Sequence, residues 1–291
     1  MKSLKELSLR IKNIKSVQKS TKMMHMVSAS KLLQSQKQLI TSRLFLSHLH
    51  LTITLLMSRI KETSLEGLMI QETKSDCNLI FIIASDRGLC GNFNSSIIKY
   101  SIDAMNFSSE HDIKTEIVFI GKKAFDIGKN LFYNNSILQV ENSQGITLKR
   151  IYAIVNSLTI SRYNEIKIYY NKYYNIFKHH ANTEIIKPWS TSSSLTHDVL
   201  LDTLSDARYI YEPNNIEYIL QSIMQEYIPL ALYSAILESI TSEHSARMIA
   251  MESANKNTKD MLNRLALLYN RSRQAKITND LIEVLGGTTT L

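Results

Sequence analysis

Apolar residues recur every third or fourth position between Glu243 and Leu291, a stretch without proline and without glycine before Gly286. This spacing places the recurring positions on one stripe of a single long helix. The two middle members of the stripe are polar, so the helix has a narrow, imperfect seam and needs a partner helix. The stripe consists of Met248, Met251, Asn255, Thr258, Leu262, Leu265 and Tyr269.

A second helical pattern occupies residues 1–60, which contain neither proline nor glycine. At about 1.5 Å per residue, each of the two helices could extend over roughly 80 Å. Helices of this length persist when two of them wrap around each other, so we interpret the two patterns as the halves of one coiled coil. The N-terminal apolar positions are Leu4, Leu7, Ile11, Ile14, Val17, Met24 and Val27.

The middle of the chain changes to short β-branched and aromatic runs, at residues 78–85, 115–121 and 165–171. Amphipathic stretches at 95–105 and 148–160 separate these runs. Strands that alternate with helices predict a mostly parallel sheet covered on both faces. The fold class is therefore helix-dominated α/β, with a small Rossmann-like domain inserted between two long terminal helices.

The limits of these parts follow from breaks in the pattern. We place an N-terminal helix at 1–60, an inserted α/β domain at 76–200 and a C-terminal helix at 206–287. Residues 65–76 lose the helical period and serve as a linker, and a serine-rich run at 190–198 closes the insertion. Pro229 is expected to kink or interrupt the C-terminal helix, and Gly286 and Gly287 are expected to end it.

Composition narrows the class of protein. The chain has 291 residues, 44% of them hydrophobic, and only three prolines and eight glycines, which favours a helix-rich protein with a real core. A net charge of +8 is too mild for a nucleic-acid signature. Cys77 and Cys90 fit neither a disulfide framework nor a zinc site, which favours a reducing cytosolic compartment. No stretch reaches the roughly twenty apolar residues of a membrane helix, and no signal peptide is indicated.

Positive charge is concentrated at the N-terminus, where residues 1–40 hold nine lysines and arginines but only one acid, Glu6. For a single lysine, a solvated surface is the ordinary explanation. Like charges along a whole helix repel one another, and this repulsion destabilises the helix unless acidic groups surround it. We therefore interpret the N-terminal helix as a basic rod inside an acidic sleeve.

The turn at residues 85–95, SDRGLCGNFNS, is the first candidate for a nucleotide or catalytic site. Its glycines have neither the number nor the spacing of a dinucleotide fingerprint. Cys90 lies beside Asp86 and Arg87 but has no histidine near it in sequence, so a turn with a structural role is the better interpretation. The eight histidines do not have metal-ligand spacing. We therefore predict no catalytic residue, no cofactor and no metal.

Three motifs stand out along the chain: residues 14–31 (IKSVQKSTKMMHMVSASK), the turn at 85–95, and residues 242–257 (SEHSARMIAMESANKN) with 267–287 (LLYNRSRQAKITNDLIEVLGG). Taken together, they resemble the gamma subunit of bacterial F-type ATP synthases. The resemblance implies an antiparallel coiled coil that acts as the central rotor stalk. Such a stalk transmits rotation of the membrane c ring to three catalytic beta subunits, couples proton flow to ATP synthesis and is itself non-catalytic.

The resemblance also implies partners and contact residues. The partners are the alpha and beta subunits of the catalytic head, the epsilon subunit and the c ring. No nucleic acid is involved, and the chain would associate with the inner membrane only through the complex, peripherally and on the cytoplasmic side. The residues implied to contact the beta subunits are Arg273, Gln274, Thr278, Arg247, Glu243, Met24 and Lys22. Those implied to contact the c ring, at the membrane end of the stalk (the foot), are Tyr211, Glu212 and Pro213.

Two departures from the family pattern affect this assignment. His25 and Ser28 replace residues that are more usually charged and alanine, and the middle domain beyond Asn94 diverges widely. The epsilon-docking surface is therefore not defined by the resemblance. Two other classes stay open from the residues alone: an α/β enzyme with helical arms, which would bind a nucleotide or substrate, and a coiled-coil scaffold that binds nucleic acid with steep salt dependence.

Overall fold

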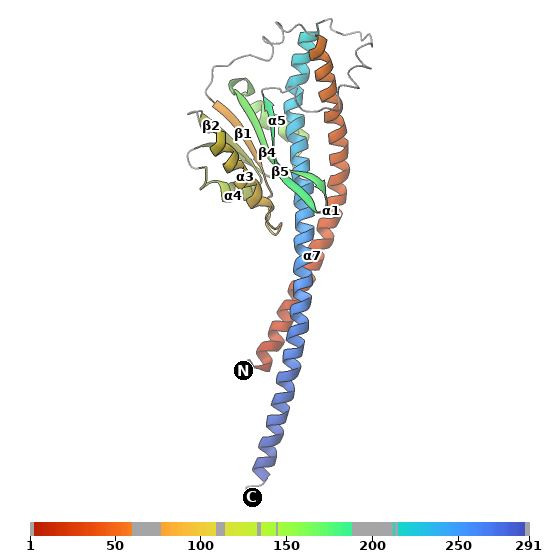
Figure 1. The fold of residues 1–291 in the computed structure, drawn as a ribbon, viewed down its shortest axis with the longest axis vertical. Helices are drawn as coiled ribbons and strands as arrows, with labels where there is room; N and C mark the ends of the chain where they lie inside the picture. Colours follow the sequence, from red (N-terminus) through yellow and green to blue (C-terminus); the bar gives the residue numbers. More distant parts are fainter. Residues whose placement is uncertain are drawn as a thin grey trace. The chain divides into compact units, whose positions relative to one another are not determined.

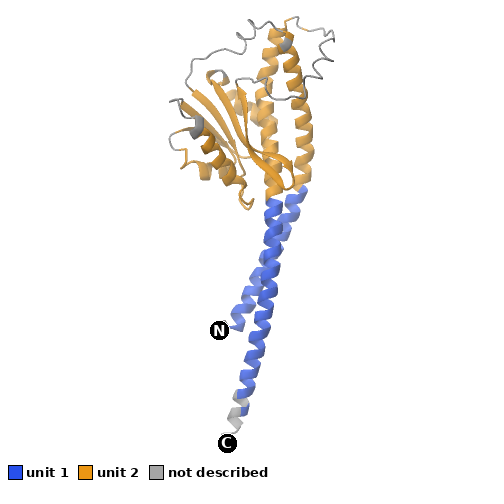
Figure 2. Cartoon of the chain, in the orientation of Figure 1, with its two compact units in different colours: residues 1–30, 247–291 blue, residues 31–246 orange. Residues whose placement is uncertain are grey.

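The computed structural model describes residues 3–59, 77–108, 114–132, 135–143, 145–187, 212 and 215–288. The chain divides into two compact units, coloured separately in Figure 2. Residues 1–30 and 247–291 form the first unit, and residues 31–246 form the second. The foot residues Tyr211 and Pro213 and both linkers, 65–76 and 190–198, lie outside the described residues.

Two long helices, α1 (Leu4–Arg59) and α7 (Ile216–Thr288), each contribute a segment to both units. Polar caps begin them. The Ser3 hydroxyl accepts a hydrogen bond from the Glu6 amide at 3.2 Å, and the Asn215 side chain accepts one from the Tyr218 amide at 3.0 Å. Each cap satisfies a backbone N–H that the first helical turn leaves open. The prediction of two long terminal helices is confirmed.

Helix α7 has no interruption at Pro229 and runs one residue past Gly287, where its end was expected. Pro229 is buried, and the neighbouring Tyr227 and Ala231 are 9% and 1% exposed. Packing against the sheet domain stabilises the helix here and outweighs the hydrogen bond that the proline removes.

In the first unit the two helical segments meet along a seam of partly buried residues. On α7 this seam is the predicted stripe: Met251 and Leu265 are buried, and Asn255, Thr258, Leu262 and Tyr269 are half-buried. On α1 the periodic apolar residues lie in the seam only as far as Ile14. Val17, Met24 and Val27 are 51%, 43% and 56% exposed. The seam positions of α1 in this unit are Leu4, Leu7, Ile11, Ile14, Gln18, Thr21, His25 and Ser28.

The alternating spacing of three and four explains this arrangement. After Ile14 the next seam position is residue 18, and the period then leads to 21, 25 and 28 whether or not those residues are apolar. The apolar residues at 17, 24 and 27 share a different face. The helical period, and not the apolar character of a residue, therefore decides which side chains of α1 lie against α7. As a result, polar residues occupy the middle of this seam on both helices.

The second unit contains a five-stranded sheet of order β3-β2-β1-β4-β5. Figure 1 labels four of its strands, β2, β1, β4 and β5. All neighbouring strands are parallel except β4 and β5, which form an antiparallel pair. This confirms the predicted mostly parallel sheet and its first, second and fourth strands. The strands are β1 (Cys77–Ile83), β2 (Lys114–Ile120), β3 (Ser136–Glu141), β4 (Glu165–Asn175) and β5 (Lys178–Lys187).

The two strands that the sequence pattern missed, β3 and β5, are the edges of the sheet. Edge strands are half exposed and therefore carry more polar residues than central ones. The sequence of β5, KHHANTEIIK, has no continuous apolar run that would identify it as a strand.

Alternate residues of the central strands fill two apolar layers. Leu79, Phe81 and Ile83 face a core shared with α1, α7 and helix α5 (Leu148–Ser157). Ile80 and Ile82 face the other core, which is covered by α3 (Phe93–Ser108) and α4 (Lys122–Gly128). A short 3₁₀ turn, Ile160–Arg162, leads into β4. Both faces of the sheet are therefore covered.

One finding on α1 departs from expectation. Within Leu4–Met57 the helix contains an 18-residue window of mean hydropathy 1.3, which suffices by length and composition to cross a membrane. The expectation that no stretch of the chain is long and apolar enough to cross a membrane is therefore wrong. Near the end of this helix, Ile53, Leu56 and Met57 are 0%, 4% and 6% exposed and belong to the core of the sheet domain. Their apolar character is explained by this packing.

Candidate functional site

The end of α7 carries the first group of predicted contact residues. Arg273, Gln274 and Thr278 are all exposed. The Thr278 hydroxyl donates to the Gln274 carbonyl at 3.0 Å, a bond along the helix that leaves most of its side chain accessible. Gln274 and Thr278 are four residues apart and so share one face, whereas Arg273 lies about 100° around the helix from Gln274.

This end of α7 also presents apolar residues that the sequence reasoning missed. Ser272 is half-buried, but every residue from Arg273 to Leu285 whose side chain the structure describes is exposed. Four large apolar side chains are among them. A helix that leaves a broad apolar face open to water has poor stability alone and is typical of a surface completed by a partner. These side chains are Ile277 (51% exposed), Leu281 (59%), Ile282 (61%) and Leu285 (66%).

A signal for this surface was present in the sequence. The seam of α7 follows the three-and-four spacing to Tyr269. Ile277 does not occupy any of the positions that this spacing predicts farther along the helix. Apolar residues that leave a seam while the helix continues indicate a second face to be covered.

The remaining predicted beta-contact residues are in different environments. On α1, Lys22 is exposed and Met24 is 43% exposed, and Met23 and Met26 beside it are 52% and 57% exposed. On α7, Arg247 is half-buried, but Glu243 is only 1% exposed. A carboxylate at this depth has no surface for direct contact with another subunit, so we keep Glu243 out of the direct-contact set.

The predicted foot contact lies almost entirely outside the described residues. Of its three members, only Glu212 is described, and it is exposed. The structure therefore adds no geometry for this group.

Comparisons with known proteins agree with the sequence motifs. The family model described as ATP synthase matches residues 3–291. The gamma chain of Wolbachia sp. subsp. Brugia malayi (strain TRS) is 60% identical over the full length of both chains, and that of Ehrlichia canis (strain Jake) is 37% identical over 99% of this chain and 98% of its own.

This chain belongs to the ATP synthase gamma-chain family.

Solved structures extend the family likeness to the fold. A chain from the Euglena gracilis mitochondrial ATP synthase, in a structure of its OSCP, F1 and c-ring, matches with a TM-score of 0.69 at 18% identity. The match covers 99% of this chain and 94% of that one. A chain from the rotor of the same enzyme matches with a TM-score of 0.65, also at 18% identity. The fold is thus shared with chains of this ATP synthase at low sequence identity.

The turn at residues 85–95 has a structural role in this gamma chain. The Asp86 carboxylate accepts hydrogen bonds from the Lys122 amide (3.1 Å) and from the amide (3.2 Å) and hydroxyl (3.1 Å) of Ser143. In an α/β sheet, the amides where a strand meets a following helix are those that would hold a phosphate. A carboxylate of the chain itself occupies that position, and its charge would repel a phosphate.

Cys90 is part of the same turn and is built into its packing. It is 2% exposed, and its sulfur lies 3.3 Å from Asn94 Nδ2 and 3.8 Å from Ser85 Oγ. The Ser85 hydroxyl in turn donates to the Arg87 carbonyl at 2.6 Å. Among the described residues, no group of three or more histidine, cysteine or acidic side chains could hold a metal ion. The turn is therefore a folded connection from β1 into α3.

Proposed function

We propose that this chain is the central rotor stalk of an F-type ATP synthase and that the uncovered end of α7 is its main contact with the catalytic head. The observation that carries the proposal is the exposed helix from Arg273 to Leu285, with its four apolar side chains. Gamma chains that share the full length of this sequence support it. The partners of the helix are the alpha and beta subunits.

A stalk of two helices has no threefold symmetry, whereas a ring of three like subunits is close to threefold symmetric. Each beta subunit therefore meets a different face of the stalk. A partner shifts a conformational equilibrium only by the difference between its contacts in the two states. Different faces can thus hold three identical subunits in three different states, and rotation passes each subunit through all of them. The stalk itself needs no nucleotide and is non-catalytic.

Exposure of the predicted contact residues in the first unit supports their assignment. We assign Arg273, Gln274 and Thr278 on α7, and Lys22 and Met24 on α1, to direct contact with the beta subunits. The half-buried Arg247 is a partial contact. Every basic residue from Lys5 to Lys22 on α1 is exposed, so the helix presents a positive surface. An acidic surround would attract such a surface diffusely and would still permit rotation.

The other end of the coupling lies at the foot. We assign Tyr211, Glu212 and Pro213 to contact with the c ring, and the sheet domain to the neighbourhood of the epsilon subunit. Through the c ring the chain would sit on the cytoplasmic side of the inner membrane as a peripheral subunit. Proton flow would turn the ring, and the stalk would carry that rotation to the beta subunits and so drive release of ATP.

Replacement of both Arg273 and Gln274 by alanine tests the head contact. Both side chains are exposed, so the chain should fold and the complex should assemble. Cooperative ATP hydrolysis by the reconstituted head should fall about tenfold, as expected when central interface residues are lost. Arg264→Ala, an exposed arginine earlier on the same helix and well separated along its axis from Gln274 and Thr278, is the matched control and should leave the rate unchanged. A wild-type cooperative rate in the double variant would remove both residues from the contact.

Deletion of residues 211–213 tests the foot. Hydrolysis by the head should persist, whereas ATP-driven proton pumping in membrane vesicles should be lost because the ring no longer turns with the stalk. Pumping at the wild-type rate would contradict the assignment of these residues to the c ring.

A further inference from the structure

Strand β4 extends beyond its neighbour in the sheet. Its pairing with β1 ends where Ile82 lies opposite Tyr169, whereas its pairing with β5 continues to Asn175 opposite Lys178. From Asn171 onward, the edge of β4 that faced β1 has no neighbouring strand in the part of the chain that the structure describes. Buried backbone groups on such an edge need other hydrogen-bond partners.

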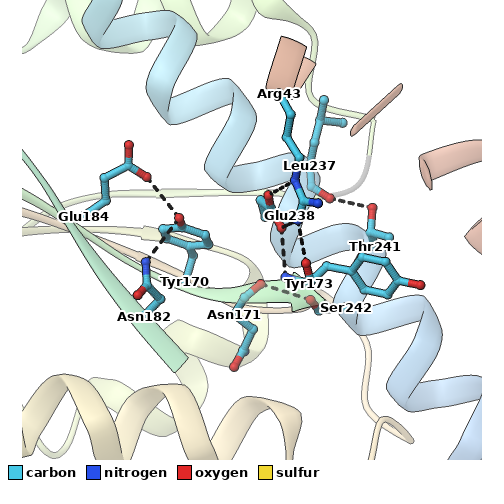
Figure 3. Close-up of polar contacts among 10 residues, drawn as sticks. All are labelled: Arg43, Tyr170, Asn171, Tyr173, Asn182, Glu184, Leu237, Glu238, Thr241 and Ser242. Atoms are coloured by element: carbon cyan, nitrogen blue, oxygen red, sulfur yellow. Dashed lines mark hydrogen bonds and ion pairs between the residues drawn. The ribbon is translucent and has the colours of Figure 1, made fainter. Parts of the chain in front are cut away.

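Side chains of the two long helices supply those partners (Figure 3). Glu238 on α7 accepts from the Tyr173 amide at 2.8 Å, and Arg43 on α1 donates to the Tyr173 carbonyl at 2.5 Å. The Ser242 hydroxyl donates to the Asn171 carbonyl at 3.0 Å. Asn171 and Tyr173 are two residues apart, so their backbone groups point to the same edge of the strand.

The same helix face continues to the turn after the strand. The Ser245 hydroxyl donates to the Ile176 carbonyl. Glu238, Ser242 and Ser245 are spaced by four and three residues, which puts them on one stripe of α7. This stripe runs along the extension of β4 in the place of a missing strand. We call Arg43, Glu238, Ser242 and Ser245, with the β4 backbone that they bind, the strand-edge joint.

A fork of two hydrogen bonds holds the centre of the joint together. Arg43 Nε lies 2.6 Å from Glu238 Oε1, and Arg43 Nη2 lies 2.7 Å from Glu238 Oε2. Bidentate pairs of this kind fix orientation as well as distance. Glu238, Ser242 and Ser245 are 5%, 0% and 0% exposed. Separating the helices from the sheet would leave buried donors and acceptors unsatisfied, which is costly.

The joint therefore resists sliding and rotation of the sheet domain relative to the helix segments at 31–59 and 216–246. An apolar contact alone permits such motion more easily because it is not directional. The core around Ile53 and Leu232 already stabilises this packing. The directional bonds also fix the register of β4 against α1 and α7. Stability alone does not require a fixed register.

We propose that the strand-edge joint transmits torque between the sheet domain and helices α1 and α7, with Glu238 as its main positioning residue. The proposal rests on the proposed function as a rotor stalk. The joint would keep the sheet domain and the helices turning as one body under load, and none of its residues contacts a nucleotide.

The test uses the whole membrane-bound complex in inverted vesicles and compares ATP hydrolysis with ATP-driven proton pumping. The main variant is the triple change Glu238→Ala, Ser242→Ala and Ser245→Ala, and Glu238→Gln is a milder one. Glu141→Gln is the matched control. It removes another arginine–glutamate fork, in which Arg150 Nη2 lies 2.5 Å from Glu141 Oε1, between α5 and β3 inside the sheet domain.

The triple variant should hydrolyse ATP within about twofold of wild type, while protons pumped per ATP fall about threefold or more. Glu238→Gln should show a smaller fall, because it keeps an acceptor for the Tyr173 amide, and Glu141→Gln should show none. Faster hydrogen exchange along the β4 extension in the two joint variants should report that the joint has opened. If these residues only stabilised the fold, their loss would lower the amount of assembled complex. The number of protons pumped per ATP by the complex that did assemble would stay unchanged.

A wild-type pumping ratio in assembled triple and Glu238→Gln complexes would overturn the proposal. Loss of assembly in both variants would overturn it as well, because the residues would then serve folding alone. If the complex with the wild-type chain itself failed to pump, the proposed rotor function would fail instead. The wild-type arm thus separates the two conclusions.

Discussion

The two compact units of this chain differ in how completely each buries its own apolar surface. In the second unit the central strands are covered on both faces, and residues such as Phe81, Ile82 and Phe119 are fully buried. In the first unit only Leu7, Ser28, Met251 and Leu265 are buried among the residues that the structure describes. Large apolar side chains there, such as Leu281, face solvent.

This difference separates a fold that is complete by itself from one that is completed by partners. The central strands of the sheet domain are covered on both faces, and the open edge of β4 is bonded to α1 and α7, within the chain. The terminal helices have a polar seam between them and apolar residues on their outer faces. Such a pair gains its full stability only when other subunits cover the outer faces. It can also exchange those contacts in succession, as a rotor must.

The largest expected effect is in the sheet core. Phe119→Ala removes a fully buried ring that packs against Phe125 and Phe132, and should lower the free energy of unfolding by about 4 kcal/mol. Phe177→Ala, at an 82% exposed position, is the control and should change it by less than about 0.5 kcal/mol. Urea titration measures both. Equal effects would contradict the assignment of a tight core to this unit.

A smaller, pH-dependent effect is expected at Glu116 on β2. Burial alone would raise the pKa of this carboxyl, but hydrogen bonds from Tyr163 (2.7 Å) and Arg162 outweigh burial and lower the pKa below its usual value. A carboxyl with a lowered pKa stabilises the fold above its unfolded pKa of about 4.3, and this stabilisation is lost as the pH falls through the folded value.

Glu116→Gln should therefore cost about 1.5 kcal/mol at pH 7, and the difference from wild type should shrink below about pH 4. Urea titrations at neutral and acidic pH would measure this. A difference that stayed constant between the two pH values would show that the charge of Glu116 does not matter.

The polar seam of the first unit gives an effect of opposite sign. Asn255 is half-buried at a seam position, and Asn255→Leu should stabilise the isolated chain by about 1 kcal/mol, because apolar seam residues pack better. Glu252→Leu, at an exposed position three residues earlier, should give no such gain. Thermal unfolding followed by circular dichroism measures both. A destabilised Asn255→Leu chain would mean that the seam is already optimal.

The smallest effect is expected at the end of α7. Leu281→Ala removes a side chain that is 59% exposed, so the free energy of unfolding of the isolated chain should change by less than about 0.5 kcal/mol. The same change should weaken association with the catalytic head about tenfold. Titration of the labelled chain into alpha and beta subunits measures the second value. Unchanged affinity would remove the apolar end from the contact.

The sequence pattern predicted the elements with a clear period or a continuous apolar run. Both terminal helices, the parallel strands β1, β2 and β4, and the seam of α7 follow from such patterns. The edge strands β3 and β5 could not be found this way, because exposed edges need no apolar run. The α1 seam was missed for a related reason: Val17, Met24 and Val27 are apolar, but the helical period puts Gln18, Thr21 and His25 between the helices.

The candidate site was predicted in part. Motifs pointed to Arg273, Gln274 and Thr278, and these side chains are exposed. Motif resemblance could not show that Glu243 is buried, because burial depends on packing between segments far apart in sequence. The strand-edge joint was missed for the same reason. The spacing of Glu238, Ser242 and Ser245 suggests one helix face, but only the fold reveals the open edge of β4 beside it.

Purification of the chain with its proposed partners tests the central claim most directly. Expressed together with alpha, beta and epsilon subunits, the chain should elute in one complex that holds a single copy for every three alpha and three beta subunits. Residues 273–285 should then be protected from hydrogen exchange that is rapid in the isolated chain. A chain that elutes alone, with this end equally unprotected, would contradict the account.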